Sequence, residues 1–151
     1  MYVNLVLFQG SDLSDNEGLW ATDGTAAGTT HLSVAGAGSG GNAFVAGGLQ
    51  PADLTVFGSE VLFNGTDAAG DGGLWVTNGT GAGTSQLTVA GAWADGLTPG
   101  FLTVFGNEVL FSGYDAAGHD DLWVTDGTGA GTSKLAVTSA NFFGLAPTDM
   151  T

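Results

Sequence analysis

The feature of this sequence that most constrains its fold is an internal repeat. The pattern Leu-Trp-x-x-(Asp/Asn)-Gly-Thr-x-x-Gly-Thr occurs three times, starting at Leu19, Leu74 and Leu122. A shorter pattern, Phe-x-Gly-x-Asp, precedes each copy and starts at Phe8, Phe63 and Phe111. Successive copies are 55 and then 48 residues apart. A repeat of this length is typical of one supersecondary unit used several times. The sequence therefore predicts three tandem units in a single domain, at about 1–55, 56–103 and 104–151.

Each unit contains four short β-rich segments and no helical period. In the third unit, residues 102–105 and 109–111 flank a Gly-Asn pair, which indicates a β-hairpin. Residues 122–125 and 133–137 predict two further strands, joined by a glycine-rich loop. Leucine and tryptophan point to opposite faces of the third strand, so we expect both faces to be covered. The predicted fold class is all-β.

The two ends of the chain carry a further prediction. Aligning the three prolines sets Thr151 opposite Thr103, whereas Met1 lies opposite Val104. The first strand of the hairpin is then divided between the two ends of the chain. We therefore expect the repeat to close into a ring, either within one molecule or between neighbouring molecules.

Two kinds of ring fit the repeat. Four-stranded units of about 48 residues suit the blades of a β-propeller, but propellers typically have four to eight blades. Two chains would supply six blades in a homodimer. The alternative is a β-trefoil, in which three four-stranded units close as a monomer. The periodicity alone does not separate these two architectures.

The three Leu-Trp repeats resemble a bacterial repeat family with the signature Glu-Leu-Trp-x-x-Asp-Gly-Thr. The hairpins at 54–63 and 102–111 are similar to that family as well, and the match spans essentially the whole chain. The family occurs as longer arrays in large bacterial proteins, so the resemblance implies propeller-like stacking more than a trefoil. We expect a bacterial protein with an extracellular or cell-surface location. Gly18, Gly73 and Asp121 stand where the signature has Glu, and Asn78 replaces its Asp.

The charge of the chain limits its partners. Fifteen acidic residues face one basic residue, Lys134, which gives a formal net charge of −14. Such an excess repels phosphate backbones and anionic lipids, so neither nucleic acid nor a membrane is an expected partner. Lys134 has no evident partner in the sequence. No stretch resembles a signal peptide or a membrane span, and the chain lacks cysteine.

Tryptophans are the candidate ligand contacts. Trp20, Trp75 and Trp123 could serve as repeated platforms for sugar rings, or they could fill the space between neighbouring units. Trp93 lies in a connection, with Asp95 nearby, and has no counterpart in the other units. An exposed loop tryptophan of this kind is the better candidate for a glycan contact.

Acidic loops are the candidate metal sites. Asp12, Asp67 and Asp115 occupy one equivalent position, and each loop contains further acids, among them Asp15, Asp71 and Asp120. Hard oxygen ligands in glycine-rich loops suit calcium, while ordinary Asx-turns explain the same spacing. Asp23, Asn78 and Asp126 precede Gly-Thr and are expected to cap turns.

Nothing in the sequence indicates catalysis. His31 and His119 fall at non-equivalent positions, and the Gly-Thr-Gly-Ala-Gly-Thr segments open no helix and lack the lysine of a phosphate-binding loop. We expect a non-catalytic module for binding and self-assembly, with no cofactor other than the candidate calcium. The alternatives are a carbohydrate-binding lectin and a structural fibre or lattice subunit.

Overall fold

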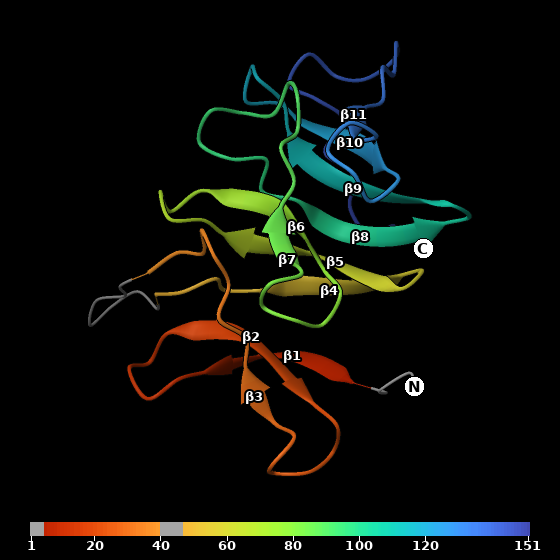
Figure 1. The fold of residues 1–151 in the computed structure, drawn as a ribbon. Helices are drawn as coiled ribbons and strands as arrows, with labels where there is room; N and C mark the ends of the chain where they lie inside the picture. The colour runs from red at the N-terminus through yellow and green to blue at the C-terminus, as the bar shows by residue number, and fades with distance from the viewer. Residues whose placement is uncertain (1–4, 40–46) are drawn as a thin grey trace.

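The computed structural model describes residues 5–39 and 47–151, and these residues form three separate antiparallel sheets stacked one above another (Figure 1). The first sheet consists of β1 (Val6–Ser11), β2 (Glu17–Thr22) and β3 (Thr30–His31). The second consists of β4 (Ala52–Phe57), β5 (Glu60–Thr66), β6 (Gly72–Thr77) and β7 (Thr84–Gln86). The third consists of β8 (Gly100–Phe105), β9 (Glu108–Tyr114), β10 (Asp120–Thr125) and β11 (Ser133–Lys134). The predicted all-β class is therefore confirmed, with three antiparallel sheets of three or four strands in the described residues.

Each sheet is a meander in which strands pair in chain order. The register repeats from unit to unit: Phe8 lies opposite Trp20, Phe63 opposite Trp75, and Phe111 opposite Trp123. These aromatic pairs stack with ring centroids 6.3–6.4 Å apart. The same stacked pair in all three sheets explains why phenylalanine and tryptophan recur together in the sequence.

The turn after the tryptophan strand is built the same way in all three units. In the second unit, the Asn78 side chain accepts hydrogen bonds from the Thr80 backbone N–H (3.1 Å) and hydroxyl (2.7 Å). Asp23 and Asp126 cap the equivalent turns. At the end of β6, the Thr77 hydroxyl lies 2.6 Å from the hydroxyl of Thr84, and both residues are buried. Turn capping by these residues was predicted and is seen at all three positions.

The hydrophobic cores lie between the sheets. One core joins the first and second sheets around Phe63 and Trp75, and the other joins the second and third around Phe111 and Trp123. In the second sheet, Leu74 and Trp75 point to opposite faces and each is 1% exposed. The predicted cover on both faces is present in this middle sheet.

Two details differ from the sequence prediction. The fourth strand of the third unit, predicted over 133–137, ends at Lys134, because the chain turns away once the Leu135 N–H has bonded the Leu122 carbonyl. The first sheet has three strands among the described residues, because β1 has a partner on one edge only. Met1, which was aligned with Val104, lies outside the described residues.

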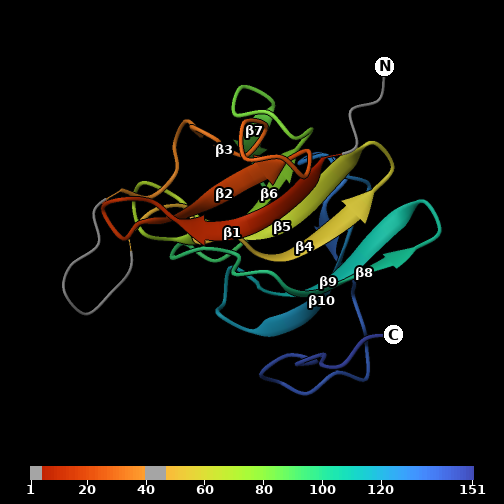
Figure 2. The ribbon, with the colours of Figure 1, turned by 90° about the horizontal axis from the view of Figure 1, so that it is seen from below.

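The described residues contain no sheet that closes on itself, and the three sheets form an open series (Figures 1 and 2). β4 and β8, the first strands of the second and third sheets, lie side by side, and the Thr55 hydroxyl donates a hydrogen bond to the Leu102 carbonyl at 3.3 Å. Ring closure therefore stays a prediction, as does the choice between propeller and trefoil.

Candidate interaction site: two open ends and an unpaired edge

Where two sheets meet, the leucine of the earlier sheet and the tryptophan of the later one share a core: Leu19 with Trp75, and Leu74 with Trp123. The leucines of the first two sheets, Leu19 and Leu74, are 0% and 1% exposed, while Leu122 of the third sheet is only half-buried. The tryptophans show the opposite trend, since Trp75 and Trp123 are buried and Trp20 of the first sheet is half-buried. The series therefore has a tryptophan face open at one end and a leucine face open at the other.

A leucine from the connecting segment completes each contact between sheets. Leu97 lies over Gly113, where an added Cβ would come within 3.0 Å of its Cδ1 and 3.2 Å of Trp123 Cδ1. A Cβ at this position would be in tight contact with both side chains, so a larger residue would require them to shift. Leu49 lies over Gly65 beside Trp75 in the same way. The Leu97 carbonyl also accepts a hydrogen bond from the Tyr114 backbone N–H at 2.8 Å, and both leucines are 3% exposed.

The outer faces carry the two halves of this contact separately. At Gly10, the equivalent of Gly113, the three atoms nearest to an added Cβ among the described residues belong to Trp20 and Phe8, whereas a leucine is among the nearest at Gly65 and Gly113. Leu145, the equivalent of Leu97, is 38% exposed and follows two phenylalanines, Phe142 and Phe143, that are also exposed. The third sheet thus ends in an exposed leucine, Leu145. The first sheet presents Gly10 and Trp20, which are equivalent to the glycine and tryptophan that such a leucine contacts between sheets.

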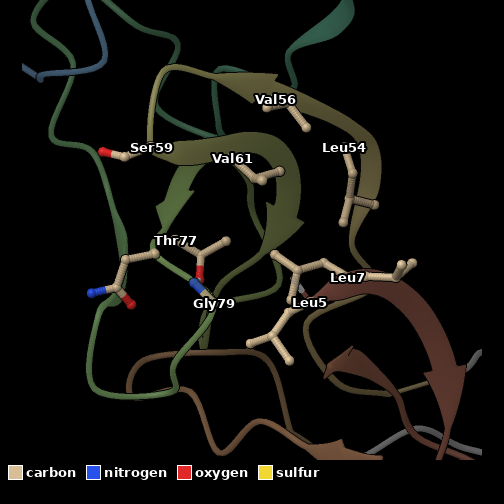
Figure 3. A pocket seen from close by; sticks show the side chains of 10 residues that line it. Leu5, Leu7, Leu54, Val56, Ser59, Val61, Thr77 and Gly79 are labelled. Atoms are coloured by element: carbon tan, nitrogen blue, oxygen red, sulfur yellow. The ribbon is translucent and has the colours of Figure 1, made fainter. Parts of the chain in front are cut away.

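A cavity of about 410 Å³ lies beside the unpaired edge of β1 (Figure 3). Leu5 and Leu7 form one side of it, and Leu54 and Val56 of β4 form the other. Val56 is 71% exposed, whereas Val104, its equivalent on β8, is 47% exposed next to β4. The cavity lies where the first strand of the first unit would run.

Residues 148–151 lie against β8 in the way that β8 lies against β4. The Thr103 hydroxyl lies between two carbonyl acceptors, Phe101 of its own strand at 3.1 Å and Met150 at 3.2 Å. Thr55 has the same arrangement, with Asp53 at 3.0 Å and Leu102 at 3.3 Å. Asp149 has φ 51°, and its equivalents Asp53 and Phe101 have φ 54° and 57°. The segment therefore has the backbone form with which the first strands of the other units begin.

The tryptophans on the strands lie in the packing positions. Trp75 and Trp123 are each 1% exposed, and their indole N–H groups donate to the carbonyls of Gly65 and Gly113 at 3.0 and 2.9 Å. Trp20 makes the same bond to Gly10. Burial of two of the three rings favours the packing interpretation over sugar platforms.

Trp93 is 40% exposed and packs at a tilt against Tyr114, with ring centroids 5.7 Å apart. It lines a hollow of about 250 Å³ together with Asp67, Asp71 and Gln86, whereas Asp95 is exposed and does not line this hollow. The structure therefore places Trp93 in one hollow with acids of the second loop, and Asp95 outside this hollow.

The equivalent aspartates of the acidic loops bind their own backbone. One oxygen of each carboxylate accepts the N–H groups two and four residues onward: Ser14 and Asn16 for Asp12, Ala69 and Asp71 for Asp67, and Ala117 and His119 for Asp115. These are Asx-turns. Hydrogen bonds from Asn16 lower the pKa of Asp12. For Asp67, burial opposes the loop hydrogen bonds, which prevail and lower its pKa.

Lys134 has two partners, contrary to the expectation from the sequence. Its ammonium lies 2.6 Å from Asp115 Oδ2 and 3.1 Å from Asp121 Oδ2. The hydrogen bond from Lys134 lowers the pKa of Asp115 to about 2, and the two carboxylates raise the pKa of Lys134. The pairing was missed because the two carboxylates lie 19 and 13 residues before Lys134, Asp115 just after β9 and Asp121 on β10. Asp115 Oδ1 thus accepts two backbone N–H groups, and its Oδ2 accepts a hydrogen bond from the Lys134 ammonium.

The remaining candidate ligands are dispersed. Asp15 is exposed with φ 58°, Asp71 is half-buried, and burial together with the charge of Asp121 raises the pKa of Asp120. Within residues 5–39 and 47–151, no three His, Asp or Glu side chains are grouped so that they could hold a metal ion. Calcium binding stays a prediction without a defined ligand set.

The sequence analysis missed the residues that complete the contacts between sheets. Leu49, Leu97 and Leu145 each follow a glycine in the variable connections, where the pattern predicted only loop. Thr55, Thr103 and Thr151 recur every 48 residues. Aligning the connections as well as the strands would have found both series.

Comparison of the chain with protein-family models, with curated proteins and with solved structures finds no match. The resemblance to the repeat family therefore rests on the repeated motif alone. In the described part of the chain, no helix is long and apolar enough to cross a membrane.

Proposed function

We propose that this chain is a non-catalytic repeat module that works by associating end to end with copies of itself. The observation that carries this proposal is the polarity of the sheets, which leaves the tryptophan face of the first and the leucine face of the third uncovered. The same two faces bury each other twice within the chain. The two open faces of the chain would therefore pack against each other as the sheets within the chain already do.

Two copies joined in this way would form a ring of six blades, completing a β-propeller as a homodimer. Separate meanders of three or four strands that stack face to face support blades over a trefoil. Three blades fall below the usual four to eight, and six lie within that range. Each copy would contribute both of its ends, so the ring would hold two equivalent contacts between chains.

The same contact could also propagate without closing. A head-to-tail contact gives a ring if its rotation closes and a filament if it does not. The fibre or lattice alternative therefore differs from the ring in the angle between units, and the contacting residues would be the same. A bacterial cell-surface or extracellular setting would suit either assembly, and it is proposed from the resemblance of the repeats.

Carbohydrate binding is a second candidate, favoured by the hollow around Trp93. A half-exposed indole beside Asp71 and Gln86 offers a stacking surface and hydrogen-bonding groups, and no cation lines this hollow. These features suit a neutral sugar. A glycan array tests this candidate: binding that Trp93→Ala abolishes supports it, and silence from the folded chain refutes it.

Sedimentation equilibrium over a dilution series tests self-association. The proposal predicts a species of twice the 14.9 kDa chain mass that dissociates on dilution. Masses that grow without limit as concentration rises would indicate the filament. A single 14.9 kDa species at every concentration would overturn the proposal.

A further inference from the structure

We propose that the unpaired edge of β1 is a strand-accepting groove, and that its occupant is residues 148–151 of a second copy of this chain. This inference rests on the proposed self-association and specifies the site at which one copy enters the other. The mode is β-augmentation, in which an extended segment adds a strand to an open sheet edge.

The groove has an edge and a floor that fit an added strand. Within residues 5–39 and 47–151, no strand pairs with β1 on the side opposite β2, so in this part of the chain the edge has no strand partner. Leu54 and Val56 of β4 form an apolar floor under that edge (Figure 3). A strand in this groove would form backbone hydrogen bonds with β1 and would also cover Leu54 and Val56.

Repeat symmetry identifies the occupant. If the first sheet of a second copy stacks on the third sheet as the third stacks on the second, residues 148–151 already lie in the place of its first strand. The bond from Thr103 to Met150 and the φ of Asp149 are the observations that support this position. The incoming segment therefore needs little reordering, which lowers the entropic cost of the contact.

The register follows from the two complete sheets. Ala52 lies opposite Asn64 and Gly100 opposite Ser112, so Thr148 of the second copy would lie opposite Gln9. In the same way, Thr55 lies opposite Leu62 and Thr103 opposite Leu110, so Thr151 would lie opposite Leu7.

A third hydrogen bond of the same series is also expected. The Thr55 hydroxyl is shared between the carbonyls of Asp53 and Leu102, and the Thr103 hydroxyl between those of Phe101 and Met150. Thr151 in the groove would donate its hydroxyl to the carbonyl of Leu54 in the receiving chain.

Disulfide cross-linking tests the register, because the chain has no cysteine of its own. Thr148 and Gln9 are both exposed, so the double variant T148C/Q9C should fold normally. Mild oxidation should convert most of it to a covalent dimer that runs at twice the chain mass on a non-reducing gel. The control T148C/S11C moves one cysteine two residues along the same face, to a diagonal distance of about 7–8 Å. This control should cross-link at least tenfold more slowly, because disulfides rarely span more than about 7 Å between Cα atoms.

The outcomes separate this inference from self-association itself. If the parent sediments as a dimer but T148C/Q9C does not cross-link faster than T148C/S11C, the strand groove is wrong and end-to-end association stands. An intramolecular disulfide in T148C/Q9C would also refute a second copy as the occupant. A parent that remains monomeric at all concentrations would refute both proposals.

Discussion

Replacing Leu145 by alanine should weaken the association of two copies while leaving the fold of each copy intact. Leu145 is 38% exposed, whereas Leu97, its equivalent in a completed contact, is 3% exposed. Association would therefore remove about a third of the Leu145 surface from water. Since full burial of a leucine is worth about 2 kcal/mol, this transfer contributes about 0.7 kcal/mol.

The cavity left by truncation raises the cost to about 1.5 kcal/mol at each contact. A closed pair of chains has two such contacts, so Leu145→Ala should weaken the dimer by about 3 kcal/mol. That change corresponds to about a 100-fold increase in Kd.

Sedimentation of parent and variant over the same dilution series measures this change. Two further variants serve as controls. Leu97→Ala, within the chain, should lower the free energy of unfolding by about 3 kcal/mol in urea, whereas Leu145→Ala should change it little at concentrations where the chain is monomeric. Ser85→Ala, exposed on β7, should change neither quantity. An unchanged Kd for Leu145→Ala would refute the idea that this leucine repeats the role of Leu97.

Two further predictions concern an ion pair and a buried hydrogen bond, and a third concerns the net charge. Because Lys134 lowers the pKa of Asp115 to about 2, the ion pair stabilises the fold above pH 4 and is lost as pH falls toward 2. Lys134→Met should therefore cost about 1 kcal/mol at pH 7, and its difference from the parent in urea titrations should shrink below about pH 4. Thr77→Val leaves the buried Thr84 hydroxyl with one partner fewer and should cost about 1–2 kcal/mol in the same assay, and Thr22→Val, at the half-buried equivalent, should cost less. With a formal charge of −14 on each chain, association should tighten as salt rises from about 0.02 to 0.3 M, and a Kd that increases over this range would contradict that reasoning.

Local structure could be predicted from this sequence because it depends on residues close along the chain. The meander of each unit, the capped turns and the stacked aromatic pairs all depend on residues that lie within one copy of the repeat. The neighbours of each sheet could not be predicted in this way. Trp20 and Trp123 have the same local sequence context, yet one is half-buried and the other is 1% exposed, because only the latter has a sheet packed over it.

The interaction site was hidden for the same physical reason. Leu145 lies in a segment whose sequence predicts only a loop. The position of its equivalent Leu97 over Gly113 indicates what Leu145 could contact. The strand starts depend on positive φ at Asp53 and Phe101, residues that do not signal this conformation as glycine would. Contacts between units therefore required the three-dimensional structure.

Electron microscopy of the associated species tests most directly whether the two open ends are halves of one contact. Class averages should show closed rings of six radial sheets, with the first sheet of each copy seated on the third sheet of the other. Particles in which two copies meet side by side, with both ends still uncovered, would contradict the account.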